Sequence, residues 1–470
     1  LSEISLNQFY GIELDDFAHE IAILALWLTK HQMNVEFFKE FGRTNPTLPL
    51  TDAGNIVQGN ACRLDWKEVC PKNENDEIYI LGNPPYQGFK MQSSSQKEDL
   101  NNIFSNYKNF KFLDYISCWF LLASKYIDSS TKVAFVSTNS ICQGVQVEII
   151  WPAVLSFNIE LFFAHTSFKW TNNAKGGAGV SCVVIGLREK CNRSKHIITK
   201  NHSKLVKNIN SYLLNGENII VKKRKKSLSN FPQITDGSGA LDGGNLILNT
   251  NEKTDLIKLR PETKRYIRPY LGSNEFIKGL KRWCIWIEDN ELDIALSIDS
   301  IKTRVDAVRN FRENAGTRAQ TAIGRPHKFA WINQPNKTQI IVPTVSSERR
   351  SYIPIGFLDN HPVVSNAANV IHNPEPFIFS IITSKIHMNW VRTVAGKLED
   401  RIRYTSAICY NTFPFPNIST QRKEELTQCT LKIIDERLKH SEKTLAQLYD
   451  PDKMPEGLKE AHHQNDLAVE

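Results

Sequence analysis

Four consecutive residues, Asn83, Pro84, Pro85 and Tyr86, have the chemistry needed to activate an aromatic amine. Such an amine is a poor nucleophile because its lone pair is delocalised into the ring. It becomes competent when acceptors draw its hydrogens out of the ring plane, and the Asn83 side-chain carbonyl and the Pro84 main-chain carbonyl are two such acceptors. The two prolines remove main-chain donors and restrict the torsions, so both carbonyls are held at low entropic cost. Tyr86 offers a face on which an extruded base can stack.

The position of this loop agrees with that chemistry. It directly follows Gly82 and the apolar run Ile78–Leu81, which is typical of a β-strand. In open α/β sheets, ligands bind outside the carboxyl ends of the strands, so a catalytic loop is expected there. The alternative is a structural proline turn that ends a strand, with Tyr86 as a partly buried aromatic residue.

Two earlier strand ends carry residues suited to a nucleoside-containing cofactor. Glu13 follows the run Gln8–Ile12, and a carboxylate at a strand end can accept both ribose hydroxyls. Asn60 and Ala61 follow the run Asn55–Gln58, and the Asn60 amide suits the donor and acceptor edge of adenine. Glu13 as a helix-capping acid and Asn60 as a turn residue are the alternatives.

The elements that must position these residues alternate between strands and helices over residues 1 to about 190, which predicts an α/β domain with a mostly parallel, doubly wound sheet. The expected strands are Gln8–Ile12, Asn55–Gln58, Ile78–Leu81 and Lys132–Ser137, and the expected helices are Ala18–Thr29 and Tyr115–Ile127. We therefore expect a catalytic domain over residues 1–195.

Residues from about 200 to 415 are richer in Asn, Gly, Pro, Lys and Arg and predict a mixed α+β domain over residues 196–417. Its expected strands are Arg282–Ile287, Gln339–Pro343 and Tyr352–Phe357. A C-terminal helical segment is expected over residues 418–470, with one helix at Thr420–Leu438 and a second piece at Glu442–Tyr449 that ends before Pro451.

Bulk composition narrows the class of protein only slightly. The 470 residues predict two or three domains, and 41% hydrophobic with 23% charged residues is ordinary for globular proteins. The net charge of +8 is uneven, and the basic run Lys222–Lys226 fits either a polyanion partner or a solvated loop.

The nine cysteines have irregular spacing without a Cys-x-x-Cys pair, so we expect neither a disulfide framework nor a metal site. Cytoplasmic localisation follows as an expectation. No membrane span is expected either, because the apolar run Ile21–Leu28 is far shorter than the roughly 20 residues that a span requires.

A glycine-rich loop that would let the backbone approach a cofactor is not found ahead of these motifs. The sequence Gly237-Ser238-Gly239 follows a stretch without the apolar strand that such a loop requires. We therefore predict a surface loop there and no permuted order of motifs.

The order of the motifs resembles that of MmeI-type restriction-modification proteins over essentially all 470 residues. The segments that carry the resemblance are Gln8–Glu13, Gly59–Trp66, Leu81–Tyr86, Ser137–Gly144, Phe163–Trp170, Val345–Pro354 and Leu448–Pro451.

This resemblance implies a gamma-order DNA adenine-N6 methyltransferase that uses S-adenosyl-L-methionine and binds double-stranded DNA. It implies a Rossmann-like methyltransferase sheet that lacks its first strand, a target-recognition domain and C-terminal helices, without the family's N-terminal nuclease and connector. We therefore expect no cleavage activity. It also implies that Phe168 or Trp170 forms a second aromatic wall opposite Tyr86, with core packing as the alternative.

For base recognition, side chains with directional donors and acceptors must be held at a DNA groove. The segment Gly396–Tyr404, with Glu399, Arg401 and Arg403, resembles the specificity-determining segment of the family. Asn366 and Ala367 resemble its companion position. A surface ion pair of little energetic value is the alternative for Glu399 and its arginines. Residues 346–350 could bind phosphate or brace two domains.

Three functions remain open from the sequence. The first is site-specific DNA adenine methylation in a restriction-modification system. The second is a catalytically inactive DNA-binding remnant, or a subunit that needs a separate N-terminal chain to complete its cofactor site. The third is methylation of a protein glutamine or an RNA base, which uses the same loop chemistry, although the large basic second domain disfavours a small peptide substrate.

Overall fold

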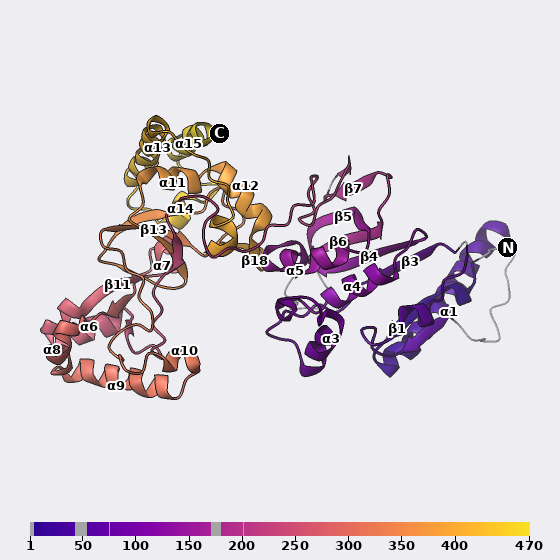
Figure 1. Ribbon diagram of the computed structural model, residues 1–470, viewed down its shortest axis with the longest axis horizontal. Coiled ribbons are helices and arrows are strands. Elements are labelled where there is room, and N and C mark those ends of the chain that lie inside the picture. Colours follow the sequence, from indigo (N-terminus) through magenta and orange to yellow (C-terminus); the bar gives the residue numbers. More distant parts are fainter. Residues whose placement is uncertain (1–3, 43–53, 75, 171–179, 201) are drawn as a thin grey trace. The chain divides into compact units, whose positions relative to one another are not determined.

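The computed structural model describes residues 4–42, 54–74, 76–170, 180–200 and 202–470 (Figure 1). The chain divides into two compact units, Leu1–Ile220 and Val221–Glu470.

Strands of the first unit form two sheets. They are β1 (Tyr10–Glu13), β2 (Asn55–Gln58), β3 (Ile78–Gly82), β4 (Thr131–Thr138), β5 (Ile159–Trp170), β6 (Val180–Glu189), β7 (Lys195–Ile198) and β8 (Ser203–Val206). Strands β1 and β2 pair in parallel, and the other six follow the order β3-β4-β6-β5-β7-β8. The α/β class is confirmed. In the six-stranded sheet β3, β4, β5 and β7 run in one direction, as expected of a mostly parallel sheet, while β6 lies antiparallel between β4 and β5 and β8 is antiparallel to β7.

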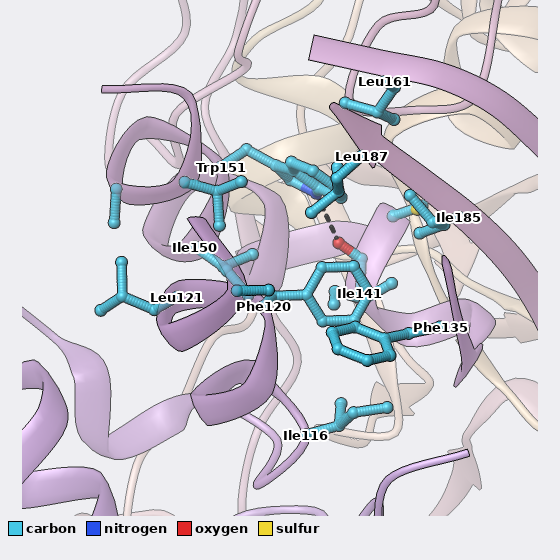
Figure 2. Packing of buried hydrophobic residues seen from close by; sticks show 14 of the residues in the cluster. Ile116, Phe120, Leu121, Phe135, Ile141, Ile150, Trp151, Leu161, Ile185 and Leu187 are labelled. Carbon is cyan, nitrogen blue, oxygen red and sulfur yellow. Dashed lines mark hydrogen bonds between the residues drawn. The ribbon is translucent and has the colours of Figure 1, made fainter. Parts of the chain in front are cut away.

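Helices of the first unit are α1 (Asp16–Phe41), α2 (Trp66–Val69), α3 (Ser94–Phe104), α4 (Ser117–Tyr126) and α5 (Gly144–Leu155). They divide between its two sheets: α1 and α2 contact the β1–β2 pair, while α3, α4 and α5 share an apolar core with the larger sheet. Figure 2 shows Phe120 of α4 between Phe135 of β4 and Trp151 of α5, with ring centroids 5.4 and 6.0 Å from Phe120. The Trp151 indole N–H donates to the Ile141 carbonyl at 2.9 Å, which ties the segment after β4 to this core.

Helix α1 is longer than the predicted Ala18–Thr29. It starts where the Asp15 carboxylate accepts from the N–H of Ala18 at 3.1 Å, and it ends at Gly42, whose φ of 64° is the left-handed conformation that glycine adopts readily. No residue of α1 is buried, and the apolar side chains of Phe17, Leu24 and Leu28 are exposed.

Strands of the second unit are short and belong to three sheets, ordered β10-β12-β11-β16, β15-β13-β17-β9 and β14-β19-β18. They are β9 (Ile234–Asp236), β10 (Ile247–Leu248), β11 (Ile267–Leu271), β12 (Trp283–Ile285), β13 (Thr338–Pro343), β14 (Val345–Ser346), β15 (Gly356–Asp359), β16 (Val363–Val364), β17 (Ala368–His372), β18 (Gly396–Leu398) and β19 (Arg401–Arg403).

Helices of this unit are α6 (Thr250–Leu259), α7 (Ser273–Lys278), α8 (Leu292–Leu296), α9 (Asp299–Glu313), α10 (Thr317–Gln320), α11 (Pro376–Ile382), α12 (Lys385–Val394), α13 (Thr420–Leu438), α14 (Leu445–Leu448) and α15 (Glu456–Val469). The mixed α+β expectation is confirmed, as is the helix at Thr420–Leu438. The predicted second piece shortens to α14, and α15 was not anticipated. Helices α11, α13 and α15 share one apolar core.

The prediction of a surface loop at Gly237-Ser238-Gly239 is wrong, because all three residues are buried. A Cβ atom on Gly237 would lie 2.3 Å from the Ser365 carbonyl oxygen, and one on Gly239 would lie 2.0 Å from the Trp331 ring. The two glycines therefore permit close packing inside the second unit, and the rejection of a cofactor role for them agrees with this position.

Arg312 of α9 is fully buried, with a relative exposure of 0%, and has no carboxylate partner among the described residues. All five of its N–H donors bond to main-chain carbonyls at 2.7–3.0 Å. The acceptors are Ala240, Leu241, Ala322, Arg325 and Lys328. One side chain thereby joins two loops that are about 80 residues apart in the sequence. Ala240 lies 72 residues before Arg312, and Ala322 lies 10 residues after it.

We predict that Arg312→Lys destabilises the second unit by about 3–5 kcal/mol, because three ammonium donors cannot satisfy five buried carbonyls. Urea unfolding followed by tryptophan fluorescence and circular dichroism measures the effect. Arg309→Lys, on an exposed position of the same helix, is the matched control. Equal stability of the two variants would contradict the assigned role.

Candidate functional site

The predicted catalytic loop leaves the end of β3 and lies partly at the surface. Asn83 and Pro85 are exposed, Pro84 is buried and Tyr86 is half-buried. In the described part of the chain, the Asn83 carboxamide makes no hydrogen bond, so its carbonyl is available to an external amine. The loop is therefore not packed into the interior. Such packing would have excluded a catalytic role.

The exit of this loop is anchored at Gln87. Its N–H donates to Asp114 Oδ1 at 2.8 Å, while its carbonyl accepts from the N–H of Tyr115 at 3.0 Å and from Gln92 Nε2 at 2.9 Å. Asp114 and Gln92 are both buried, with exposures of 8% and 6%. Sequence reasoning missed these anchors, because nothing in the local pattern indicates that Asp114 faces the loop.

Burial raises the pKa of Asp114 above its ordinary value, and the N–H groups of Gln87 and Ile116 partly oppose this shift. Both N–H groups bond to the same oxygen, Oδ1, at 2.8 and 3.3 Å. The anchoring geometry therefore needs an acceptor at Oδ1 and does not need a negative charge.

Tyr86 lies against the apolar core of the first unit. Burial is the main cause that raises the pKa of Tyr86. Phe168 and Trp170, the predicted second wall, are on β5 with ring centroids 6.3 Å apart, and Trp170 is 37% exposed. Phe168 is opposite Cys182 in the β5–β6 register.

Glu13 is the last residue of β1 and is half-buried. Its main-chain carbonyl accepts from the N–H of Gly59, at the end of β2, at 2.7 Å. Within the described residues its carboxylate forms no hydrogen bond or ion pair, and a free carboxylate at a strand end fits a ribose diol. Its role stays a prediction.

Asn60 participates in a network of internal hydrogen bonds. Its side-chain oxygen accepts from the N–H of Cys62 at 2.8 Å, and Nδ2 donates to Asp99 at 2.9 Å. Asp99 also accepts from Tyr115 at 2.7 Å and from Arg63 at 2.7 Å. Although burial opposes the shift, these hydrogen bonds lower the pKa of Asp99. This geometry favours the alternative in which the Asn60 side chain stabilises a turn.

Ala61 is likewise part of this turn, because its carbonyl accepts from the Trp66 indole at 2.9 Å. Contacts from Asn60 and Ala61 to a cofactor stay predictions.

In the second unit, Asn366 and Ala367 form an exposed turn between β16 and β17. A hollow of about 470 Å³ adjoins this turn and is lined by Asn366 together with Tyr270, Arg282 and Trp331. The turn therefore combines an exposed amide with a nearby concave surface.

Glu399 occupies the turn between β18 and β19 with a φ of 58°, and it pairs with Arg401 at 3.0 Å. Their side chains are 77% and 46% exposed, so the pair contributes little to stability. Arg403, two residues beyond Arg401 on β19, is exposed too. Glu399, Arg401 and Arg403, three of the five predicted recognition residues, are thus on one short hairpin.

Thr344 connects the turn and the hairpin, and sequence reasoning missed it. Its hydroxyl donates to the Ala367 carbonyl at 2.6 Å, and its carbonyl accepts from the N–H of Tyr404 at 2.8 Å. The structure therefore brings the two predicted recognition segments together through one threonine.

Two basic segments have plainer environments. Arg349 forms an ion pair with Asp452 at 2.6 Å, which braces the segment before α15 within the second unit. The run 222–226 is exposed and has no regular secondary structure.

All nine cysteines are free. Among the described residues, no group of three or more His, Cys, Asp or Glu side chains is placed to hold a metal ion. No helix in that part of the chain combines the length and apolar character needed to cross a bilayer.

Family models define the class of protein. The model of the DNA-methyltransferase domain of MmeI matches residues 1–199, that of its target recognition domain matches residues 215–417, and that of its C-terminal domain matches residues 418–470. The chain therefore joins a DNA-methyltransferase domain to a target-recognition domain.

Two relatives agree with these models. "DNA methyltransferase A" of Bacillus subtilis (strain 168) is 43% identical over 473 residues, which cover 99% of this chain and 54% of that protein. The structure of the Type IIL restriction-modification enzyme MmeI in complex with DNA matches with a TM-score of 0.91 and 37% identity, covering 100% of this chain and 64% of that one. The chain thus spans about half the length of the curated relative. It belongs to the MmeI family, and the resemblance inferred from the motifs is confirmed.

We predict that Asp114→Asn keeps the anchor of the catalytic loop and that Asp114→Ala costs about 1–3 kcal/mol, because only Asn retains an acceptor for the two N–H groups. The raised pKa of the folded state means that stability from this group is fully present below the ordinary value of 3.8 and is lost as pH rises through the raised pKa. Asp114→Asn should therefore show a smaller loss of stability with rising pH than the parent.

Unfolding free energies measured between about pH 4 and 8 test this, with Asp306→Asn at an exposed position of α9 as the control. A larger loss for Asp114→Asn than for Asp114→Ala at neutral pH would contradict the anchoring geometry.

Proposed function

We propose that this chain carries out site-specific adenine-N6 methylation of double-stranded DNA as part of a restriction-modification system. The observation that carries the proposal is the exposed Asn83 carbonyl on a loop whose exit is bonded through Gln87 to buried side chains. A rigid acceptor pair beside an aromatic side chain is suited to an aromatic amine that has left the helical stack.

Each residue of the loop has a part in this reaction. The Asn83 side-chain carbonyl and the Pro84 main-chain carbonyl accept hydrogen bonds from the two N–H groups of the adenine amine. These bonds draw the hydrogens out of the ring plane, which restores nucleophilic character to the nitrogen. Pro85 keeps the loop stiff, and Tyr86 stacks on the flipped base, with Phe168 or Trp170 as the second wall.

S-adenosyl-L-methionine, when bound, supplies the activated methyl group. Glu13 would hold its ribose, and the main chain around Asn60 and Ala61 would contact its adenine. The free Glu13 carboxylate at the end of β1 fits that role, because strand ends are where α/β sheets bind nucleosides.

Completion of the cofactor site depends on a further segment. Within the described residues, β1 pairs only with β2 and β3 pairs only with β4, so each has an unpaired edge, and both are in parallel pairs. We propose that an upstream segment, in the same polypeptide or in a separate chain, adds a strand there and brings a glycine-rich loop to Glu13.

We assign base reading to the turn at Asn366 and Ala367 and to the hairpin with Glu399, Arg401 and Arg403. Arginine and asparagine side chains offer the bidentate contacts that distinguish bases in the major groove. The link through Thr344 supports a common reading surface for the two segments. A protein or RNA substrate finds no comparable support, because the matched second domain is a target-recognition domain of a DNA enzyme family.

We predict that Asn83→Ala lowers methyl transfer by at least about a hundredfold, because one of two preorganised acceptors is removed. The assay follows tritium from labelled S-adenosylmethionine into unmethylated bacterial genomic DNA, with the polypeptide that carries these 470 residues. Asn73→Ala, at an exposed loop position of the same unit, is the matched control. Calorimetric titration with S-adenosylmethionine separates a chemical defect from lost cofactor binding, and equal labelling by parent and Asn83→Ala would exclude the catalytic assignment.

We predict that Arg401→Ala leaves the unfolding free energy within about 1 kcal/mol, because its ion pair is exposed. The same change should relax the preference at one base pair of the methylated site by about five- to a hundredfold, since one directional contact is lost. Mapping methylated adenines in DNA from cells that express the variant measures this effect. Arg422→Ala is the control, because Arg422 is 45% exposed and pairs with Glu425 on α13. An unchanged site in the Arg401 variant would place base reading elsewhere.

A further inference from the structure

Residues 222–226 form a run of five basic residues near the start of the second unit. All five side chains are exposed. Among the described residues, no carboxylate forms an ion pair with Lys222, Arg224, Lys225 or Lys226. Neighbouring like charges repel each other, so a run of this kind is ordinarily loose when nothing holds it. We call residues 222–226 the basic strap.

The main chain at the centre of the basic strap is held by hydrogen bonds. The N–H of Arg224 donates to the Ala407 carbonyl at 2.9 Å, and the Arg224 carbonyl accepts from Asn411 Nδ2 at 2.9 Å. Asn411 is buried, with a relative exposure of 3%. Both main-chain groups of Arg224 are thus bonded inside the second unit, while its side chain points to the surface.

The residues that follow the basic strap are attached to the same segment. The N–H of Leu228 donates to the Asn411 carbonyl at 2.9 Å, and the Ser229 hydroxyl donates to the Phe415 carbonyl at 3.0 Å. The rings of Phe231 and Phe415 stack with centroids 4.1 Å apart. These contacts belong to the apolar core that contains Phe415, so the strap is tied to the core at several successive points.

The basic strap contacts the segment that follows the hairpin proposed to read bases. Ala407, its hydrogen-bond partner, is in the π-helical turn Ser406–Tyr410, four residues after Arg403. Four residues of chain span at most about 14 Å. One helical turn of B-DNA is roughly 34 Å long. The strap and the hairpin are therefore close enough to contact one turn of the same duplex.

We infer that the basic strap binds backbone phosphates of the DNA beside the bases that the hairpin of β18 and β19 reads. This inference rests on the proposed function, and it assigns the strap no part in base reading or in methyl transfer. Phosphate contacts need cations with little directional geometry, and they set the register of a protein on the duplex. Because the main chain of Arg224 is already fixed, less conformational entropy is lost when the neighbouring side chains bind.

Salt dependence measures such contacts directly, because each neutralised phosphate releases bound counterions. In B-DNA, each contact steepens the fall of log affinity with log salt by about 0.9. The strap variant Lys222→Gln/Lys225→Gln/Lys226→Gln should therefore flatten this slope by about two to three, and weaken binding about ten- to three-hundredfold at roughly 0.1 M salt. The methylated sequence should stay the same, since phosphates carry no base information.

The experiment measures binding to a duplex with the mapped site by fluorescence anisotropy, from about 50 to 300 mM salt, with the polypeptide that carries these 470 residues. The control variant Lys432→Gln/Lys443→Gln/Lys453→Gln removes the same charge from three other exposed lysines of the second unit. A weaker overall field alone would change binding by both variants equally. Circular dichroism checks that both variants are folded, as expected for changes at exposed positions.

Ethylation interference locates the contacts, because ethylation removes the charge of a single phosphate. The parent and the control variant should be sensitive at a few discrete phosphates within about one turn of the mapped site. The strap variant should lose part of this sensitivity, since the cations that contact those phosphates are gone.

Two kinds of negative outcome have different meanings. If the strap variant keeps the slope of the parent, if the control variant flattens it as much, or if interference is spread evenly along the duplex, the strap inference is overturned while the proposed function stands. If the parent neither binds duplex DNA nor transfers a methyl group to it, the proposed function itself fails, and the inference fails with it.

Discussion

The main chain of Gln87 is hydrogen-bonded on both sides by buried side chains and by the N–H of Tyr115, and this constraint fixes the loop for which we propose a catalytic role. Asp114 holds its N–H, and Gln92 and Tyr115 hold its carbonyl. Because these partners are buried or packed against the core, the loop cannot move without breaking several bonds at once. A reaction that depends on two aligned carbonyls needs that stiffness, since misplaced acceptors do not activate an amine.

In the second unit, too, side chains form hydrogen bonds with main-chain groups, but different residues do so. Arg312 satisfies five carbonyls of two loops, and Thr344 links the Asn366 turn to the hairpin after Glu399. In both places one side chain serves main-chain groups that are distant in sequence. The Arg312 bonds are buried, whereas the Thr344 hydroxyl bond that links the two segments proposed to read bases is exposed, and the exposed ion pair of Glu399 and Arg401 adds little to stability.

This chain is shorter than both relatives, and strands of its first unit have unpaired edges among the described residues. The chain spans 54% of the Bacillus subtilis relative and 64% of the MmeI chain. Among the described strands, β1 and β3 each have one unpaired edge, and α1 exposes Phe17, Leu24 and Leu28. Unpaired edges and exposed apolar side chains of this kind are ordinarily covered in a folded domain.

The sequence by itself determined the α/β class of the first unit and several local elements, among them β2 and α13, and it led to the catalytic role proposed for Asn83–Tyr86, because strand alternation, helix caps and short motifs act over a few neighbouring residues. Only the tertiary structure decided that Gly237 and Gly239 are buried against Ser365 and Trp331 and that Asp114 anchors Gln87. Such contacts join residues from about 30 to 130 positions apart, as Gln87 and Asp114 at |i−j| of 27 illustrate. No local pattern records them, because the partner of a buried polar group is chosen by how distant segments pack.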